Sequence, residues 1–146
     1  NMANLVVSAG FPDNYKTIFK GFGEQPQKKN DVAGDLVIII KIIEENKFKR
    51  KDNNLYYNTS ISLIDSIVGK IIDIPYFNDE KIKINTLDLG IILNNKDYLI
   101  ENKGLPIYSN SSKKGNMFIN FNVENKKIKN IDKISELKKL LIDIIN

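Results

Sequence analysis

The chain has 146 residues, of which 42% are hydrophobic, so it is long enough to form one ordinary domain or two small ones with a buried core. It contains no cysteine and no histidine, which excludes disulfides, thiolate nucleophiles and cysteine-based zinc sites and removes the commonest general base. Its net charge of +4 comes almost wholly from lysine, because Arg50 is the only arginine. Lysines interleaved with acids and asparagines are typical of a solvated surface, whereas nucleic-acid readers tend to gather arginine on one face.

No stretch approaches the roughly 20 apolar residues that a membrane-spanning helix needs. The start of the chain also lacks the charged and then apolar pattern of a signal peptide. We therefore expect no membrane partner, and we take the cytoplasm as the expected compartment. We also expect no cofactor.

The most apolar stretch is residues 36–43, which only Lys41 interrupts. It follows the turn signal Gly34-Asp35 and consists largely of β-branched residues, which predicts a strand covered on most of both faces. Upstream, residues 15–20 alternate in character and predict a short antiparallel strand. A polar loop at residues 24–33 connects the two predicted strands.

Beyond residue 51, the pattern predicts a series of short strands around one internal helix. The expected strands are residues 55–62, 70–77, 81–86, 97–101 and 117–123. Residues 63–68 predict about two turns of helix closed by Gly69, with Asp65 and Ser66 facing solvent. We interpret residues 102–115 as a polar loop.

The end of the chain has helical periodicity. From Ile134, apolar residues recur at spacings of three and four, which predicts an amphipathic helix of about three turns. Its large aliphatic side chains are Leu137, Leu140, Leu141, Ile144 and Ile145. They must be buried on the chain's own sheet or on a second copy of the protein, and the sequence leaves both possibilities open.

The order of elements predicts a mainly β fold with two β-sandwich-like modules, of which the first is partial, a short internal helix and a C-terminal helix. We place the boundary between residues 44 and 45, which gives units 1–44 and 45–146. Phe48 stands close to this boundary as the one aromatic residue of a lysine-rich connector. It either seals a joint between two sheets or contacts an apolar molecule from outside.

Several short motifs, in this order, resemble the C-terminal region of DnaJ-type (J-domain) co-chaperones. They are Gly10-Phe11-Pro12-Asp13-Asn14, Phe19-Lys20-Gly21, Gly34-Asp35-Leu36, Phe48-Lys49-Arg50, Asn54-Leu55, the helix ending at Gly69, Lys103-Gly104-Leu105-Pro106 and Gly115-Asn116. The sequence departs from the family at three turns. It has Asn78-Asp79 where Asp-Gly is usual, Asn94-Asn95 where Pro-Gly is usual, and Glu45-Asn46 where His-Pro is common.

The resemblance implies that residues 1–44 are the C-terminal part of a first client-binding β-domain and that residues 45–146 are a second β-domain with a terminal dimerisation helix. It implies that Phe48, Phe19 and Ile18 contact unfolded polypeptide. It also implies a homodimer through the five aliphatic residues of the last helix, and a parent protein that presents clients to an ATP-driven seventy-kilodalton heat-shock chaperone. This stretch carries no His-Pro-Asp motif and no cysteine-rich zinc repeats.

Two other classes of function compete with this interpretation. A single-stranded nucleic-acid binder would stack bases on Tyr15, Tyr56, Tyr57, Phe118 and Phe121 between lysines. An enzyme would depend on the clustered acids of the connector region, which are Asp35, Glu44, Glu45 and Asp52. Nothing in the sequence orients these acids toward a shared reaction, so we expect no enzymatic activity and do not expect nucleic acid as a partner.

Overall fold

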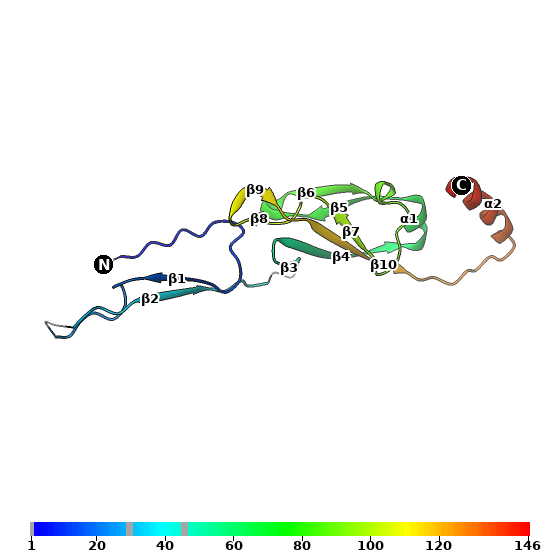
Figure 1. Cartoon of the computed structure of the whole chain (residues 1–146). Helices are drawn as coiled ribbons and strands as arrows, with labels where there is room; N and C mark the ends of the chain where they lie inside the picture. Colours follow the sequence, from blue (N-terminus) through cyan, green and yellow to red (C-terminus); the bar gives the residue numbers. More distant parts are fainter. Residues whose placement is uncertain (1, 29–30, 45–46) are drawn as a thin grey trace.

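The computed structural model describes residues 2–28, 31–44 and 47–146. Figure 1 shows an elongated molecule in which a two-stranded hairpin extends from one end of a layered β-unit and a helix stands beyond its other end. We call the hairpin of β1 and β2 the N-terminal hairpin, and the strands from β3 to β10 the C-terminal β-unit. The mainly β class, with a short internal helix and a C-terminal helix, is confirmed. The predicted boundary between residues 44 and 45 touches residues 45–46, which lie outside the described ranges.

The N-terminal hairpin pairs β1 (Tyr15–Phe19) with β2 (Leu36–Ile40) in antiparallel register. Gly23 donates its amide to the carbonyl of Gly34 at 2.8 Å and holds the strands together beyond their paired residues. The prediction that the apolar stretch is covered on most of both faces is wrong, because Val37 and Ile39, on one face of β2, are 46% and 55% exposed. A hairpin of two strands has no second sheet within the described residues to cover this face.

The C-terminal β-unit is built on a four-stranded sheet with the order β3-β4-β10-β7. Its strands are β3 (Lys49–Lys51), β4 (Asn54–Ser62), β10 (Met117–Glu124) and β7 (Asp97–Ile100). β10 runs parallel to β4, from Met117 opposite Leu55 to Glu124 opposite Ser62, whereas the other pairs are antiparallel. A second sheet, β5 (Ile71–Pro75) with β6 (Lys81–Asn85), lies over this sheet in Figure 1.

Four short elements and one longer helix complete the chain. They are α1 (Leu63–Val68), η1 (Phe77–Asp79), η2 (Thr86–Leu89), the hairpin of β8 (Pro106–Ile107) and β9 (Asn110–Lys114), and α2 (Ile134–Ile145). The β8–β9 hairpin lies inside the predicted polar loop, so that part of the prediction is wrong. β8 has only two residues and β9 is polar throughout, so neither shows the apolar alternation that predicts a strand.

Helix α1 begins and ends as predicted, but the face that it buries differs from the predicted one. Ser62 caps its start by accepting the Asp65 amide at 3.0 Å, and Gly69 ends it at a φ of 85°. The prediction that Ser66 faces solvent is wrong, because Ser66 is buried and its carbonyl accepts the Ile92 amide at 2.9 Å. A small side chain lets the Ile92 backbone approach here, and the aliphatic residues Ile64 and Val68 face outward instead.

The core lies between the two sheets of the C-terminal β-unit. Met117, Ile119 and Phe121 of β10 are fully buried, and Ile74 and Ile84 of the second sheet belong to the same cluster. The predicted alternation of β10 is confirmed, because Asn122 on the opposite face is exposed. Both faces of the sheet are thus distinguished by the period-two pattern of the sequence.

A tight backbone junction fixes the β8–β9 hairpin to the start of β4. The backbone carbonyl of Asn53 accepts a hydrogen bond from the Leu105 amide at 2.8 Å. The side-chain amide of Asn53 donates to the Pro106 carbonyl at 2.7 Å. A Cβ at Gly115 would lie 2.1 Å from the Asn53 carbonyl oxygen, so only glycine fits there. This junction places Pro106 and Tyr108 at the end of the β-unit that meets the N-terminal hairpin.

Replacing Phe121 with alanine should lower the free energy of unfolding by about 3–5 kcal/mol, because it leaves a cavity in the core. Phe118→Ala is the matched control, since Phe118 lies on the opposite face of the same strand and stacks on Tyr56 with ring centroids 5.0 Å apart. Losing this pair should cost about 1 kcal/mol. Urea unfolding of both variants measures the difference, and equal losses would contradict a core confined to one face of β10.

Candidate functional site

The contact between the N-terminal hairpin and the C-terminal β-unit is an aromatic cluster. Phe11 is buried there, with its ring centroid 4.8 Å from that of Tyr15 and 4.5 Å from that of Tyr108. The Tyr108 hydroxyl hydrogen-bonds the Tyr15 hydroxyl at 3.4 Å, and this bond raises the pKa of Tyr108. Gly10 has a φ of 89°, and a Cβ there would lie 2.0 Å from the Pro106 carbonyl oxygen. The residue that fills the contact is Phe11, which the sequence analysis names only as part of the motif at residues 10–14.

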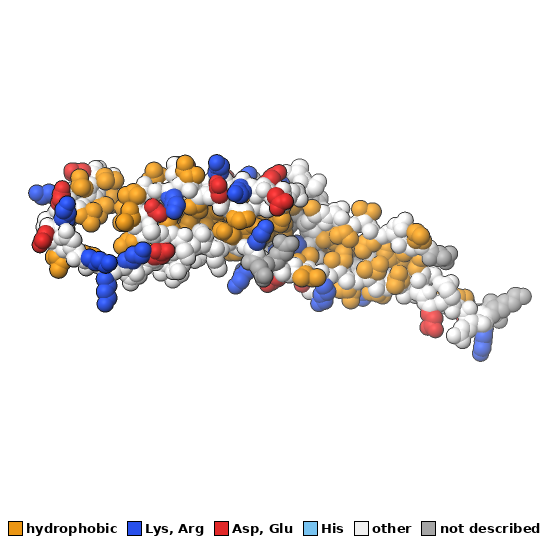
Figure 2. All heavy atoms as spheres, turned by 180° about the vertical axis from the view of Figure 1, so that it is seen from behind, with side chains coloured by type: hydrophobic (Ala, Val, Ile, Leu, Met, Phe, Trp, Pro, Cys, Tyr) orange, Lys and Arg blue, Asp and Glu red, His pale blue; other side chains and the backbone are white. Residues whose placement is uncertain are grey.

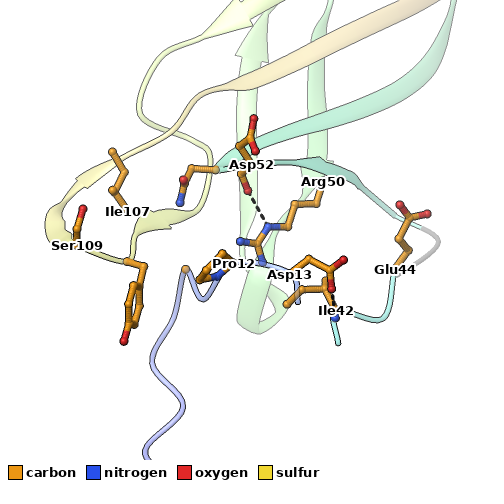
Figure 3. A pocket seen from close by; sticks show the side chains of 11 residues that line it. Pro12, Asp13, Ile42, Glu44, Arg50, Asp52, Ile107 and Ser109 are labelled. Carbon is orange, nitrogen blue, oxygen red and sulfur yellow. Dashed lines mark hydrogen bonds between the residues drawn. The ribbon is translucent and has the colours of Figure 1, made fainter. Parts of the chain in front are cut away.

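Arg50 ties the two parts together from the polar side of the same contact. Its Nη2 donates to the Phe11 carbonyl at 2.6 Å, and its Nε donates to the Asp52 carbonyl at 2.7 Å. Figure 3 shows the guanidinium between the segment that carries Pro12 and Asp13 and the segment that carries Asp52. A lysine at this position has a single charged nitrogen and lacks the planar fork that makes both bonds at once.

Asp13 forms the second polar link in this region. Its Oδ1 accepts the Ile42 amide at 2.8 Å and so fixes the end of β2 to the turn before β1. This hydrogen bond is the main reason that the pKa of Asp13 lies below its ordinary value, with smaller contributions from Lys41 and Arg50.

An open cleft of about 450 Å³ lies beside these links. Figure 3 shows the side chains that line it. Its charged lining residues are Asp13, Glu44, Arg50 and Asp52, and Gly10, Pro12, Ile42, Asn53, Ile107, Tyr108 and Ser109 complete it. Of the acids considered for catalysis, Asp35 accepts the Gly21 amide inside the hairpin instead, and Glu45 lies outside the described residues. In the described part of the chain, no three acidic side chains are grouped so as to hold a metal ion.

The structure places Phe48 in the core of the C-terminal β-unit. The side chain is 7% exposed, and its ring centroid lies 5.7 Å from that of Tyr57 and 5.8 Å from that of Phe77. Both neighbours belong to the C-terminal β-unit, so Phe48 packs within this unit. A bound polypeptide would reach only the small exposed part of the ring, and its contact with a client remains a prediction.

The other two residues predicted to contact clients lie on the N-terminal hairpin, on opposite faces. Ile18 pairs with Val37 and shares its exposed face with Ile39, and we call these three residues the hairpin surface. Phe19 lies on the other face, half-buried, with its ring centroid 6.2 Å from that of Phe22. Figure 2 shows hydrophobic side chains over much of the hairpin. Val37 and Ile39 were missed because a fully apolar strand predicts burial on both faces.

Helix α2 stands apart from the sheets, and none of its residues is buried. A hollow of about 420 Å³ runs along one side of the helix, and we call it the α2 groove. It is lined by Ile134, Leu137, Lys138, Leu141, Ile142, Ile145 and Asn146. Of the five predicted dimerisation residues, Leu137, Leu141 and Ile145 line this groove, whereas Leu140 and Ile144 are exposed beside it.

The aromatic residues considered for base stacking do not form one platform. Tyr56 and Phe118 stack on each other with an interplanar angle of 15°. Phe121 is fully buried, Tyr57 packs near Phe48, and Tyr15 lies in the contact with Tyr108. Among the described helices, none is both long and apolar enough to cross a bilayer.

The structure is a β-scaffold with several exposed apolar surfaces. It consists of a layered β-unit, an appended hairpin with an exposed apolar face, and a separate amphipathic helix. Sequence comparison identifies its family: the family described as DnaJ C terminal domain matches residues 2–125, and the chain belongs to this family. Helix α2 lies outside the matched residues. The family resemblance inferred from the motifs is thereby confirmed.

Three curated relatives illustrate the similarity. A DnaJ protein homolog of Atriplex nummularia is 30% identical over 94% of this chain and 32% of its own length. A chaperone protein DnaJ of Pelagibacter ubique is 31% identical over 83% of this chain and 31% of its own length. A DnaJ homolog of Caenorhabditis elegans is 32% identical over 95% of this chain and 37% of its own length. The chain thus spans about a third of the length of these relatives.

Acid should break the bond between Asp13 and Ile42. Because the folded pKa of Asp13 is below 3.8, the carboxylate contributes stability above pH 3.8 that is lost as the pH falls through the folded value. Amide hydrogen exchange should therefore show constant protection of Ile42 above about pH 4 and falling protection below it. In Asp13→Asn, which keeps the acceptor oxygen but does not titrate, this fall should disappear.

The Gly23 amide is the internal control for this experiment, because it donates to the Gly34 carbonyl and not to a carboxylate. Its protection should not follow the titration of Asp13. A parallel fall at Gly23 and Ile42, in the wild type and in Asp13→Asn alike, would indicate unfolding of the whole hairpin and would contradict the role given to Asp13.

Proposed function

We propose that this chain is the C-terminal client-binding and dimerisation region of a DnaJ-type co-chaperone, which holds unfolded polypeptide without making or breaking covalent bonds. We assign residues 1–44 to the C-terminal part of a first client-binding β-domain and residues 45–146 to a second β-domain with a terminal dimerisation helix. The observation that carries the proposal is the hairpin surface of Ile18, Val37 and Ile39, which is apolar and largely exposed. Membership of the DnaJ C terminal domain family supports it.

The hairpin offers a client both backbone and side-chain contacts. Within the described residues, β1 and β2 pair only with each other, so each strand keeps one edge with free amides and carbonyls. An extended client segment would add to such an edge as a further strand, and its alternate side chains would pack on the hairpin surface or on the face of Phe19. Because burial of apolar area drives this contact, binding should tolerate moderate salt, unlike the binding of a single-stranded nucleic acid.

A dimer would bind a client more tightly than one copy, because each contact of a client with the hairpin surface is weak by itself. The aliphatic side chains Leu137, Leu140, Leu141, Ile144 and Ile145 of α2 are left without cover in one copy. Two copies that share this helix as an isologous interface would present two hairpin surfaces to one client chain. The second contact is then made at high effective concentration, which raises the overall affinity without any new contact.

The proposal also includes a partner that acts on the same client. Curated relatives about three times as long as this chain include a protein named chaperone protein DnaJ. In a parent protein of this kind, the client-binding region would present unfolded polypeptide to an ATP-driven seventy-kilodalton heat-shock chaperone. The surfaces described here would supply the holding step.

Polar substitutions on the hairpin surface should weaken the holding of clients. We expect Ile18→Ser combined with Ile39→Ser to raise the amount of chain needed for half-maximal suppression of aggregation of a denatured protein by at least about fivefold. Val32→Ser is the matched control, because Val32 is also an exposed aliphatic residue, 92% exposed, but lies outside both strands. Undiminished protection by the double variant would contradict the proposed surface.

The same assay examines Phe48. Phe48→Leu keeps an apolar side chain in the core while removing the ring. The wild type and the variant are compared at a temperature at which circular dichroism shows both to be fully folded. Loss of protection in a fully folded Phe48→Leu would support client contact by this residue. Unchanged protection would assign Phe48 to the packing of the C-terminal β-unit alone.

Removing α2 should convert a dimer into a monomer. We expect sedimentation equilibrium to give twice the chain mass for residues 1–146 and the chain mass for a form ending at Asp132. Leu137→Asp should weaken the dimer in the same way, since it places a charge in the α2 groove. A monomer in both the full and the shortened form would rule out the proposed dimer.

A further inference from the structure

The end of the chain concentrates its positive charge. Residues 125–146 carry six lysines and three acidic residues, so they supply three of the four net positive charges of the whole chain. The lysines, all of them exposed, are Lys126, Lys127, Lys129, Lys133, Lys138 and Lys139. Within the described part of the chain, the one ion pair that includes any of them joins Lys126 to Glu124 at 3.4 Å. A basic segment thus follows a chain that is otherwise close to neutral.

Helix α2 divides into an apolar side and a polar side. At the 3.6-residue period of an α-helix, four polar residues gather on one side, namely Ser135, Glu136, Lys139 and Asp143. The aliphatic residues occupy the rest of the circumference, and none of them is buried. Lys138 lies between aliphatic residues of the α2 groove. Its methylene stem can run along the apolar side while its ammonium group stays in water.

Helix α2 also stands at an extremity of the molecule. Figure 1 shows it beyond the α1 end of the β-unit, at the end of a connection formed by residues 125–133, which belong to no helix or strand. The two isoleucines of this connection, Ile128 and Ile131, are 70% and 74% exposed. A flat surface that approaches from this end would therefore meet α2 and its basic connection first.

The expectation of no membrane partner rests on the lack of a stretch long enough to span a bilayer. A helix that lies flat among lipid headgroups needs only one apolar side, and lysines beside it increase its affinity for anionic lipids. We propose that α2 lies flat on an anionic lipid bilayer, with its aliphatic side at the boundary of the acyl chains and the lysines of residues 125–133 on the headgroups. This inference goes beyond client holding and does not require the proposed dimer.

The lysines favour a bilayer over a second copy as the partner in this contact. A second copy carries the same excess of lysines in residues 125–146, whereas an anionic bilayer offers the opposite charge. Both partners would cover the same aliphatic residues of α2, so they would compete for them. Vesicles of anionic lipid should therefore convert dimers into bound monomers.

Flotation with lipid vesicles tests the proposal. We expect the chain to float with vesicles that contain phosphatidylserine and to stay unbound with vesicles of phosphatidylcholine alone. A charge variant has glutamine in place of three lysines of the connection, Lys126, Lys127 and Lys129. Its affinity for the phosphatidylserine vesicles should fall at least about tenfold, because each lysine near an anionic surface contributes severalfold.

A matched control variant has the same change in net charge at another place. It has glutamine in place of three exposed lysines of β6 and β9, which are Lys81, Lys83 and Lys113. We expect it to bind like the wild type, because these lysines lie outside the basic end of the chain. Equal losses of affinity in the charge variant and the control variant would overturn the proposal, and so would equal binding of the wild type to both kinds of vesicle or no binding to either.

A tryptophan probe separates lipid binding from dimerisation. The chain has no tryptophan, so a single introduced indole reports on one position. Leu141→Trp places it on the aliphatic side of α2, and Asp143→Trp places it on the polar side. Lipids with brominated acyl chains should quench the first indole strongly and the second weakly, which contact with a second copy would not do.

The outcomes distinguish this proposal from the proposed dimer. Equal quenching of the two indoles would overturn the flat orientation of α2 on the bilayer. A wild-type chain that is monomeric without vesicles but floats with phosphatidylserine would remove the dimer and support the lipid contact. A chain that stays dimeric and unbound in the presence of those vesicles would overturn the lipid contact and leave the dimer standing.

Discussion

The parallel pairing of β4 with β10 is the interaction on which the rest of the molecule depends. It aligns the buried side chains of two strands along one face, from Leu55 beside Met117 to Ile61 beside Val123, and the second sheet closes over that face. The same pairing fixes the ends of the molecule. At its start, Asn53 and Gly115 form the junction that holds the β8–β9 hairpin toward the N-terminal hairpin. At its finish, Glu124 lies opposite Ser62, the capping residue of α1, and the chain continues from Glu124 to α2.

The individual strands and helices were predictable because each depends on a periodicity of apolar residues within a short stretch of sequence. Alternation in β10 and the three- and four-residue spacing of α2 identify both elements and their apolar faces. The partners of the strands were not predictable in this way, because the pairing of β4 with β10 joins residues about 60 positions apart. The two-residue strand β8 and the polar strand β9 show no alternation. The contacts that fix them, at Gly104, Gly115 and Asn53, exist only in the folded unit.

The site residues show the same division. Sequence reasoning selected Phe48 for its isolation among charged residues, yet the fold places it in a core with Tyr57 and Phe77. It overlooked Phe11, because the motif at residues 10–14 gave no sign that the ring would be buried between two parts of the molecule. In α1, the sequence predicted that Ser66 faces solvent, but Ser66 is buried and its carbonyl accepts the Ile92 amide, while Ile64 and Val68 are exposed. The exposed apolar surfaces that carry the proposed functions are thus the places where burial inferred from sequence failed.

The long separation of β4 and β10 along the chain also sets an order of events during synthesis. Residues 54–62 emerge from the ribosome well before residues 117–124, and until then the inner face of β4 has no neighbouring strand on the side that β10 will occupy. Contacts between residues so far apart in sequence are slow to form, because the chain loses the entropy of closing a large loop before it gains the energy of the contacts. A nascent chain of this type would therefore expose the hydrophobic inner face of β4 for a time. A protein proposed to shelter unfolded chains would, while it is being made, itself be one.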